Sequence, residues 1–228
     1  MENRLEELEK LINYKFKNIN LLKNAITHTS YVHEANLSHN ESNERLEFLG
    51  DTILNMLVSE YIFNIKPEIT EGNMTKVRAD IICESCLFEA AMKIGYGKFL
   101  LLGNGELKNG GDKRPSILSD AFEAITAAIY IDSGKGEAKK FVLNALKGKI
   151  DSVVKNIGNK DHKTRLQEIL QTNENVKIKY EIIDEKGPEH AKEYTVVVKC
   201  NGKVLGKGSG KNKKEAEQSA AGDALNKI

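Results

Sequence analysis

The sequence predicts a mainly α protein, in which an all-helical domain is followed by a small α+β domain with the element order α-β-β-β-α. Three observations lead to this prediction. Up to about residue 155, apolar residues recur at helical spacing. After residue 175 they alternate with polar residues, which is typical of half-buried strands. Residues 155–163 lie between the two patterns and are polar, with few apolar anchors, as in a linker.

The first pattern predicts helices over 2–13, 18–26, 43–64, 73–94, 116–132 and 136–155. Loops are expected at Gly103-Asn104-Gly105 and at Asn109-Gly110-Gly111, because glycine relieves backbone strain in turns. We therefore assign residues 1–150 to the first domain, 151–160 to a linker and 161–228 to the second domain.

The second domain is expected to begin with a helix over 161–171 and to end with one over 213–227. Between them, two stretches alternate in hydrophobicity, one from Val176 to Ile182 and one from Tyr194 to Val198. Asn201-Gly202 is a strong signal for a two-residue hairpin turn, and a short third strand follows it.

Composition excludes several classes of protein. Among the 228 residues, 40% are hydrophobic and 29% charged, as in an ordinary globular protein. No apolar run reaches the roughly 18 residues that a membrane span needs. The charged N-terminus, MENRLEELEK, is unsuited to a signal-peptide core. We expect no membrane association and a cytoplasmic location.

The three cysteines are Cys83, Cys86 and Cys200, an odd number that favours reduced thiols. Cys83 and Cys86 form a C-x-x-C in a segment that is patterned as a helix. Two further ligands at zinc spacing are missing nearby. We therefore expect the pair to pack in the core, with metal binding or redox chemistry as the alternative.

Residues 43–51, NERLEFLGD, place acidic side chains at the start of a predicted helix. At 100° per residue, Glu44, Glu47 and Asp51 share a sector of about 60°. Leu46, Leu49, Ile53 and Leu57 fall on the opposite side. For a helix considered by itself, this pattern is typical of a solvated acidic face.

A second acidic pair lies in residues 116–131, which are apolar nearly all round and therefore predict a buried helix. Asp120 and Glu123 lie one turn apart on it. Buried carboxylates need a partner, and Lys113 and Arg114 precede the helix start, from which they reach only its first turn. The other candidate is a cation. Oxygen ligands without histidine or cysteine favour Mg²⁺ or Mn²⁺, although ion-pair networks give similar spacing.

The motifs NERLEFLGD and SDAFEA, in this order and separation, resemble the signatures of the ribonuclease III family over about residues 1–150. The resemblance implies an all-helical endonuclease domain that depends on Mg²⁺, for which Mn²⁺ can substitute. It also implies a homodimer that cleaves double-stranded RNA and leaves 5′-phosphates, 3′-hydroxyls and short 3′ overhangs.

By position, the resemblance implies that Glu47, Asp120 and Glu123 are metal ligands. It also implies that Asp51 and Glu123 are catalytic residues. Asp51 would support the metal and its water. Glu44 would face the dimer contact. Glu71 would line the valley in which RNA is cut, although an acidic residue at a helix N-terminus explains it nearly as well.

Residues 161–228 resemble a double-stranded RNA-binding domain in DHKTRLQEIL, GPEHAKEYTV, GKVLGKGSG and KNKKEAEQSAA. Such domains recognise the shape, phosphates and 2′-hydroxyls of A-form RNA. Lys211, Lys213 and Lys214 at the start of the last helix are expected to contact phosphates. The remaining RNA-binding candidates are Thr164, Gln167 and Glu168 on the first helix and His190 in a loop.

Together these features predict a homodimeric endoribonuclease that processes ribosomal RNA precursors and other structured transcripts, without a small-molecule cofactor. Two alternatives remain: an RNA-binding protein with an inert nuclease fold, and a metal phosphohydrolase for small substrates. His28, His33 and His39 lie close in sequence, but their spacing is not a standard zinc pattern, and we expect packing and capping roles.

Overall fold

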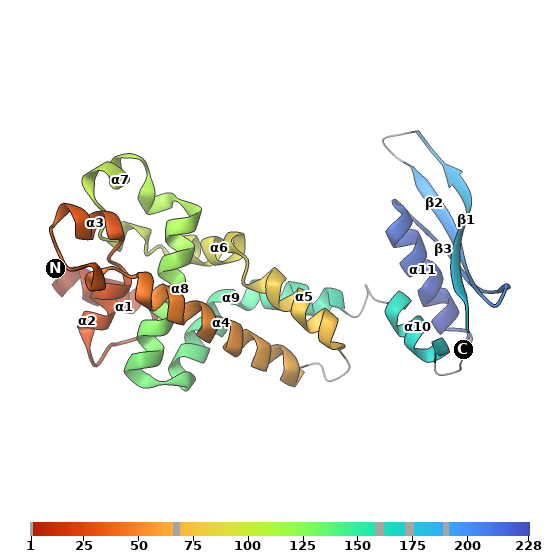
Figure 1. The fold of residues 1–228 in the computed structure, drawn as a ribbon, viewed down its shortest axis with the longest axis horizontal. Coiled ribbons are helices and arrows are strands. Elements are labelled where there is room, and N and C mark those ends of the chain that lie inside the picture. The colour runs from red at the N-terminus through yellow and green to blue at the C-terminus, as the bar shows by residue number, and fades with distance from the viewer. Residues whose placement is uncertain (1, 66–68, 158–161, 172–175, 189–191) are drawn as a thin grey trace. The chain divides into compact units, whose positions relative to one another are not determined.

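The computed structural model describes residues 2–65, 69–157, 162–171, 176–188 and 192–228 (Figure 1). The chain divides into two compact units, residues 1–154 and 155–228. The first unit is helical and the second combines helices with a three-stranded sheet. The predicted fold class is confirmed.

The first unit contains nine α-helices within the described residues, and α8 forms the centre of its core, with most of its side chains buried. Short 3₁₀ turns at His39–Glu41, Gly97–Phe99 and Gly111–Lys113 connect some of them. The helices are α1 (Glu2–Ile12), α2 (Ile19–Ala25), α3 (Thr29–Glu34), α4 (Glu44–Ile65), α5 (Glu71–Ile81), α6 (Glu84–Ile94), α7 (Asn104–Lys108), α8 (Pro115–Ser133) and α9 (Lys135–Ile157).

The prediction of one helix over 73–94 is wrong, because the chain breaks at Ile82 and Cys83 into α5 and α6. Cys83 is extended, with φ −65° and ψ 151°, and it is the N-cap residue of α6. The buried residues Val77 and Ile81 follow helical spacing, but the next one is Cys86, five residues on. The buried positions of α5 and of α6 are therefore out of phase with each other. The apolar spacing alone had joined the two segments into one predicted helix.

Two short helices, α3 and α7, were not predicted. The imidazole of His28 caps α3 by accepting a hydrogen bond from the backbone N–H of Ser30. Helix α7 occupies the segment that was expected to be a glycine loop. At its far end, helix α9 runs to Ile157 and so extends into the predicted linker, whose remaining residues 158–160 lie outside the described part.

The second unit consists of α10 (His162–Gln171), β1 (Ile178–Lys186), β2 (Glu193–Cys200), β3 (Lys203–Gly210) and α11 (Lys213–Leu225). The strands form an antiparallel sheet in the order β1-β2-β3. Asn201 and Gly202 join β2 to β3 with positive φ angles of 48° and 86°, as a type I′ turn requires. The predicted hairpin is therefore confirmed.

One face of the sheet packs on α11 with very little space between the backbones. A Cβ atom on Gly208 would lie 2.2 Å from the backbone nitrogen of Ala220, and Gly206 and Gly210 are as tightly enclosed. Val196 and Val198 of β2 complete this core, as their alternation predicted. Ile182 departs from the pattern, since it is 44% exposed beside the β-bulge of β1.

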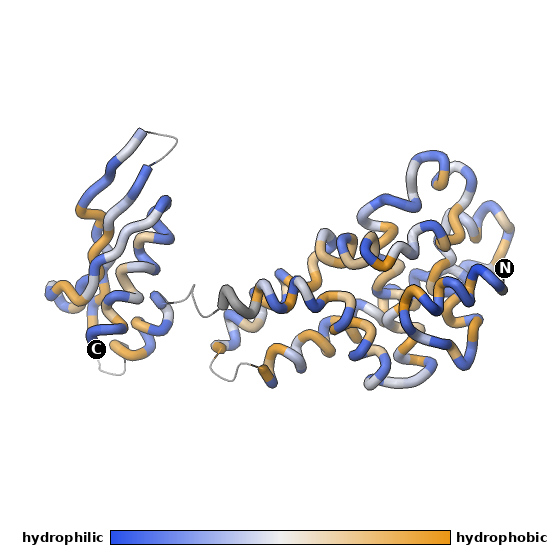
Figure 2. The backbone as a smooth tube through the Cα atoms, turned by 180° about the vertical axis from the view of Figure 1, so that it is seen from behind, coloured by the Kyte–Doolittle hydropathy of each residue, from blue (hydrophilic) through white to orange (hydrophobic). Residues whose placement is uncertain are grey.

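Hydrophobic residues recur along the tube of both units in Figure 2, alternating with hydrophilic ones. None of the helices in the described part of the chain is long and apolar enough to cross a membrane.

Candidate active site at the crossing of α4 and α8

Helices α4 and α8 cross in direct backbone contact, and Gly50 makes this possible (Figure 1). A Cβ atom at Gly50 would lie 2.0 Å from the carbonyl oxygen of Glu123, a distance that no side chain tolerates. The glycine therefore fixes which turn of α4 meets which turn of α8. Glu47 and Asp51 are on that turn of α4, and Asp120 and Glu123 are on that turn of α8.

Burial and neighbouring negative charges raise the pKa values of three of these carboxylates, Glu47, Asp120 and Glu123. Burial, and after it the negative charges of Asp51, Asp120 and Glu47, raise the pKa of Glu123 to about 8. Burial followed by repulsion from Asp120 and Glu44 raises the pKa of Glu47. Burial and then Glu84 raise the pKa of Asp120.

No lysine, arginine or histidine among the described residues forms an ion pair with any of these four carboxylates. Arg114, considered above as a partner, pairs instead with Glu106 at 2.7 Å. Asp51 has a neutral partner, since the side-chain amide of Asn55 donates to its Oδ1 at 2.9 Å. The negative charge of the cluster is therefore uncompensated within the described chain.

The carboxylates lie close enough to repel one another, yet their side chains do not converge. Within the described ranges, no three histidine, cysteine, aspartate or glutamate residues are placed to enclose a metal ion. The donor chemistry nevertheless fits a hard divalent cation, because all four groups offer carboxylate oxygens and lack a positive partner.

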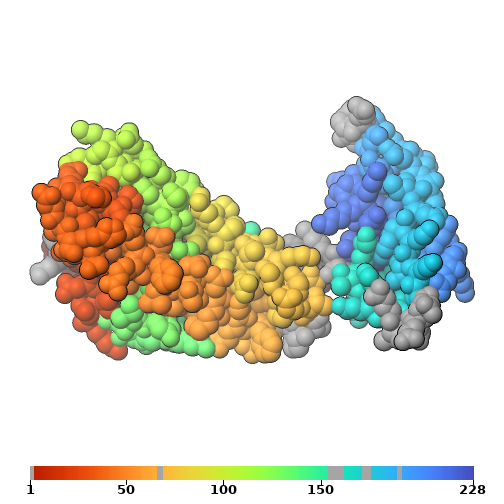
Figure 3. Space-filling model, viewed as in Figure 1, coloured from red at the N-terminus to blue at the C-terminus, as the bar shows by residue number. Residues whose placement is uncertain are grey.

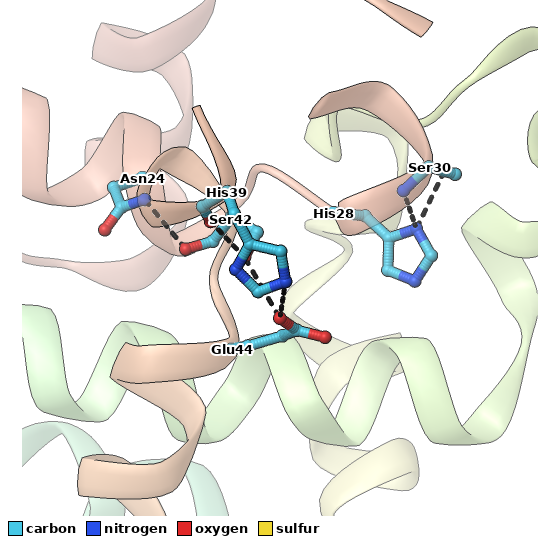
Figure 4. A network of polar contacts seen from close by, with 6 residues as sticks. All are labelled: Asn24, His28, Ser30, His39, Ser42 and Glu44. Carbon is cyan, nitrogen blue, oxygen red and sulfur yellow. Dashed lines mark hydrogen bonds and ion pairs between the residues drawn. The ribbon is translucent and has the colours of Figure 1, made fainter. Parts of the chain in front are cut away.

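Glu44 begins α4 and belongs to a separate polar network (Figure 4). Its Oε2 lies 3.2 Å from Nε2 of His39 and 3.4 Å from the hydroxyl of Ser42. Asn24 donates to the carbonyl of Ser42 at 3.0 Å and ties the start of α4 to α2. In the same view, His28 faces Ser30 and caps α3, which confirms the capping role expected for this histidine.

Glu71 is not brought to the acidic cluster within this chain. It is the exposed first residue of α5 and accepts a hydrogen bond from Thr75 at 3.1 Å. It lines a cavity of 380 Å³ between α4 and α5, together with Phe63 and Arg78. Phe63 lies sixteen residues beyond Glu47, which is about 24 Å along the helix axis.

Four residues around the cluster were missed by the sequence analysis: Gly50, Asn55, Glu84 and Tyr96. Tyr96 is fully buried and donates a hydrogen bond of 2.6 Å to the carbonyl of Leu118, five residues before Glu123. A glycine at the centre of a strongly helical pattern was the available signal for Gly50, because glycine is unfavourable there unless a backbone comes close.

Helix α4 also carries an exposed apolar stripe next to its acidic sector. Phe48 is 80% exposed and Phe63 68%, with Met56 on the same side. Leu49, expected to face the core, is partly exposed and belongs to this stripe, because Gly50 turns the helix toward α8. Figure 3 shows α4, in orange, running across one open face of the first unit.

In the second unit, Gln167 and Glu168 are exposed on one face of α10, and Thr164 is half-buried beside them. Lys211, Lys213 and Lys214 are exposed at the start of α11, where Asn212 caps the helix by accepting from the N–H of Glu215 at 2.9 Å. His190 lies outside the described residues.

Comparison with known proteins gives the same division of the chain. Residues 18–150 match the family described as Ribonuclease-III-like, and residues 162–228 match the double-stranded RNA binding motif. Ribonuclease 3 of Listeria monocytogenes serovar 1/2a is 47% identical over 226 residues, covering 99% of this chain and 98% of that protein.

Ribonuclease 3 of Caldanaerobacter subterraneus subsp. tengcongensis is also 47% identical, covering 98% of both chains. Among solved structures, the nuclease domain of ribonuclease III from Campylobacter jejuni superimposes with a TM-score of 0.58 and 40% identity. It covers 63% of this chain and 94% of that chain. A second structure of the same domain, at 39% identity and a TM-score of 0.59, is described as showing flexibility in a region involved in dimer formation.

Proposed function

Because the chain belongs to the ribonuclease III family and is an endoribonuclease of double-stranded RNA, we propose that the carboxylate cluster between α4 and α8 is its hydrolytic centre. One observation carries the proposal: the contact at Gly50 holds Glu47, Asp51, Asp120 and Glu123 together without a positive partner, and the pKa of Glu123 is raised to about 8. A fold that tolerates such repulsion needs a ligand that relieves it.

The ligand we propose is Mg²⁺, for which Mn²⁺ can substitute, held by Glu47, Asp120 and Glu123. When bound, a divalent cation activates water and stabilises the attacking and leaving oxygens of a phosphodiester. Asp51, oriented by the amide of Asn55, supports the ion and its water. Hydrolysis at this centre leaves a 5′-phosphate and a 3′-hydroxyl.

Glu123 must lose its proton before it can bind a cation. Since its pKa is about 8, each ion bound at neutral pH displaces a proton. The affinity for Mg²⁺ is therefore expected to rise with pH up to about pH 8 and to level off above it.

We further propose that the enzyme acts as a homodimer. Cutting both strands of a duplex calls for two centres related by a twofold axis, as in an isologous dimer. The exposed stripe of Phe48, Met56 and Phe63 borders the acidic sector of α4 and offers an apolar surface of the kind that dimers bury. Glu44, at the start of this helix, is proposed to face the contact, and Glu71 to line the RNA valley.

The second unit is proposed to hold the duplex. Lys211, Lys213 and Lys214 would contact phosphates, Thr164, Gln167 and Glu168 the 2′-hydroxyls, and His190 a second minor groove. Precursors of ribosomal RNA and other structured transcripts are the proposed substrates. The three free cysteines support a reducing, cytoplasmic setting.

The test is cleavage of an end-labelled RNA duplex by the wild type and by Glu123→Ala, each with Mg²⁺ and with EDTA. We expect cutting only by the wild type with Mg²⁺, and unchanged duplex binding by the variant. Glu137→Gln, which removes an exposed acid from α9, is the matched control and should cut normally. Absence of cutting in every divalent metal, with duplex binding retained, would contradict the proposal and leave an RNA-binding protein with an inert nuclease fold.

A further inference from the structure

The break between α5 and α6 brings two thiols together. Cys83 is the N-cap residue of α6, and Cys86 lies in the first turn of that helix. The two Sγ atoms are 2.7 Å apart. A disulfide bond is about 2.05 Å long, so the sulfurs lie less than 1 Å from bonding distance. The expected role of both residues in core packing is therefore wrong for Cys83, which is half-buried at a helix end.

The surroundings of the two thiols differ. Cys86 is 6% exposed, and its Sγ lies 3.2 Å from the carbonyl oxygen of Asp80. Cys83 is more accessible, and its Sγ lies 3.2 Å from the hydroxyl of Ser85. The more open sulfur is thus the one at the N-terminus of α6, where the helix dipole favours a thiolate.

The proton affinities follow this division. Burial raises the pKa of Cys86, and the neighbouring Cys83 sulfur raises it further. Burial opposes ionisation of Cys83 as well, but hydrogen bonds from Cys86 and Ser85 and the charge of Lys149 on α9 outweigh it and lower its pKa. The Lys149 ammonium interacts with both sulfurs, and the pKa of Lys149 is raised as a result.

We propose that Cys83 and Cys86 form a redox-active dithiol that a small disulfide converts reversibly into an intrachain disulfide. The Cys83 thiolate attacks one sulfur of the oxidant, forms a mixed disulfide and releases one thiolate of the oxidant. The Cys86 sulfur, giving its proton to solvent, then attacks the Cys83 sulfur and releases the second thiolate. Two electrons pass from the two cysteines to the oxidant, which leaves as two thiols.

Both sulfurs can be approached by a small oxidant, since Cys83 is only half-buried and Cys86 borders a hollow. Beside Cys86 is a hollow of 270 Å³ between α6 and α9, lined also by Lys93, Lys149 and Glu89. Two lysines against one glutamate favour an oxidant that carries carboxylates. The described residues offer no group of three metal-ligating side chains here, so zinc binding lacks its further ligands. Neither sulfur belongs to the carboxylate cluster of α4 and α8, although Glu84, next to Cys83, acts on Asp120. The inference holds whether or not that cluster is catalytic.

The experiment uses the full chain with Cys200→Ser, which removes the third thiol. The protein is equilibrated with mixtures of reduced and oxidised glutathione, quenched with acid and weighed by mass spectrometry. We expect the loss of two hydrogen atoms, no bound glutathione, and full reversal by excess reduced glutathione. A disulfide between two chains, or no oxidation in the most oxidising mixture, would overturn the proposal.

Single-cysteine variants test the order of attack. Cys86→Ser should accumulate glutathione on Cys83, and Cys83→Ser should react at least about tenfold more slowly. Cys86→Ala repeats the first variant in case serine disturbs the buried position, and circular dichroism checks the helix content of each. Equal reaction of Cys83 and Cys86 would contradict their assigned roles.

Lys149→Gln tests the charge contribution. It should slow the reaction of Cys83 by about threefold, because loss of the ammonium charge reduces the fraction of Cys83 present as thiolate. Lys147→Gln, which changes an exposed lysine of the same helix, is the matched control and should leave the rate unchanged. Equal rates for the two lysine variants would remove Lys149 from the site.

Discussion

The α4–α8 crossing and the β3–α11 interface both depend on glycine, but they bring different side chains together. The first gathers carboxylates, and the second gathers uncharged core residues. Gly50 lets two helices meet so closely that four carboxylates repel one another. Gly206, Gly208 and Gly210 let a strand meet the alanine face of α11, with a core that holds no charge. The first contact holds like charges close together, and we propose that a cation relieves their repulsion. The second is electrostatically relaxed, and its lysines face solvent.

The largest effect is expected from breaking the first contact with Gly50→Ala. The added methyl would overlap the backbone of Glu123, so the helices must separate. We expect a loss of about 3 kcal/mol in the free energy of unfolding, measured by urea denaturation, and a loss of cleavage. Gly72→Ala is the control, because nothing lies within 4 Å of its Cβ position, and a loss of stability there would contradict the explanation.

Gly208→Ala should break the second contact, at a cost of about 2 kcal/mol because a strand shifts more easily than two crossed helices. Duplex binding should fall, and hydrogen exchange at Val196 and Val198 should accelerate. Lys207→Ala, an exposed neighbour on the same strand, should leave this exchange unchanged. Unchanged exchange in Gly208→Ala would show that the close packing is dispensable.

Replacing Lys211, Lys213 and Lys214 together by glutamine tests whether these exposed lysines of the second unit contribute to duplex binding. We expect duplex affinity to fall by about 10- to 100-fold and the slope of log affinity against log salt to decrease by about 2 to 3. Filter binding at several salt concentrations measures both. An unchanged salt slope would mean that these lysines do not contact phosphates.

Glu123→Gln removes one negative charge from the carboxylates at the α4–α8 crossing, and with it the repulsion that this charge causes. The folded-state pKa of Glu123 is about 8, above its ordinary value of 4.5, so the folded state of the wild type binds more protons than the unfolded state between these limits. In EDTA, wild-type stability should fall relative to the variant as pH rises through this window. Melting temperatures should nearly agree at pH 4.5 and differ most above pH 8. A constant difference across the window would contradict the raised pKa.

The smallest effect is expected for Tyr96→Phe. It removes the hydrogen bond to the Leu118 carbonyl, whose loss in a buried position costs about 1 kcal/mol. Since this bond supports α8 beside the cluster, cleavage should also slow, while duplex binding through the second unit stays unchanged. Tyr130→Phe, on the half-buried part of α8, is the control for stability in denaturant.

The sequence by itself determined the fold class, the hairpin at Asn201-Gly202 and the candidate acids, because these follow from periodicity, turn chemistry and the cost of burying charge. It did not separate α5 from α6, since two helices that both face one core look like one helix with a phase shift. It also misjudged Leu49 and Cys83, whose environments depend on which neighbour each helix meets.

Only the tertiary structure decided how the parts meet. In the sequence, Gly50 is only an unfavourable residue within a helix. Its role follows from the carbonyl of Glu123, which packs directly against it. The raised pKa of Glu123 depends on burial and on charges that lie about 70 residues away in sequence. The 2.7 Å approach of Cys83 and Cys86 depends on a helix that begins between them. Local patterns specify elements, whereas distances between elements arise from packing, and the chemistry of this chain depends on those distances.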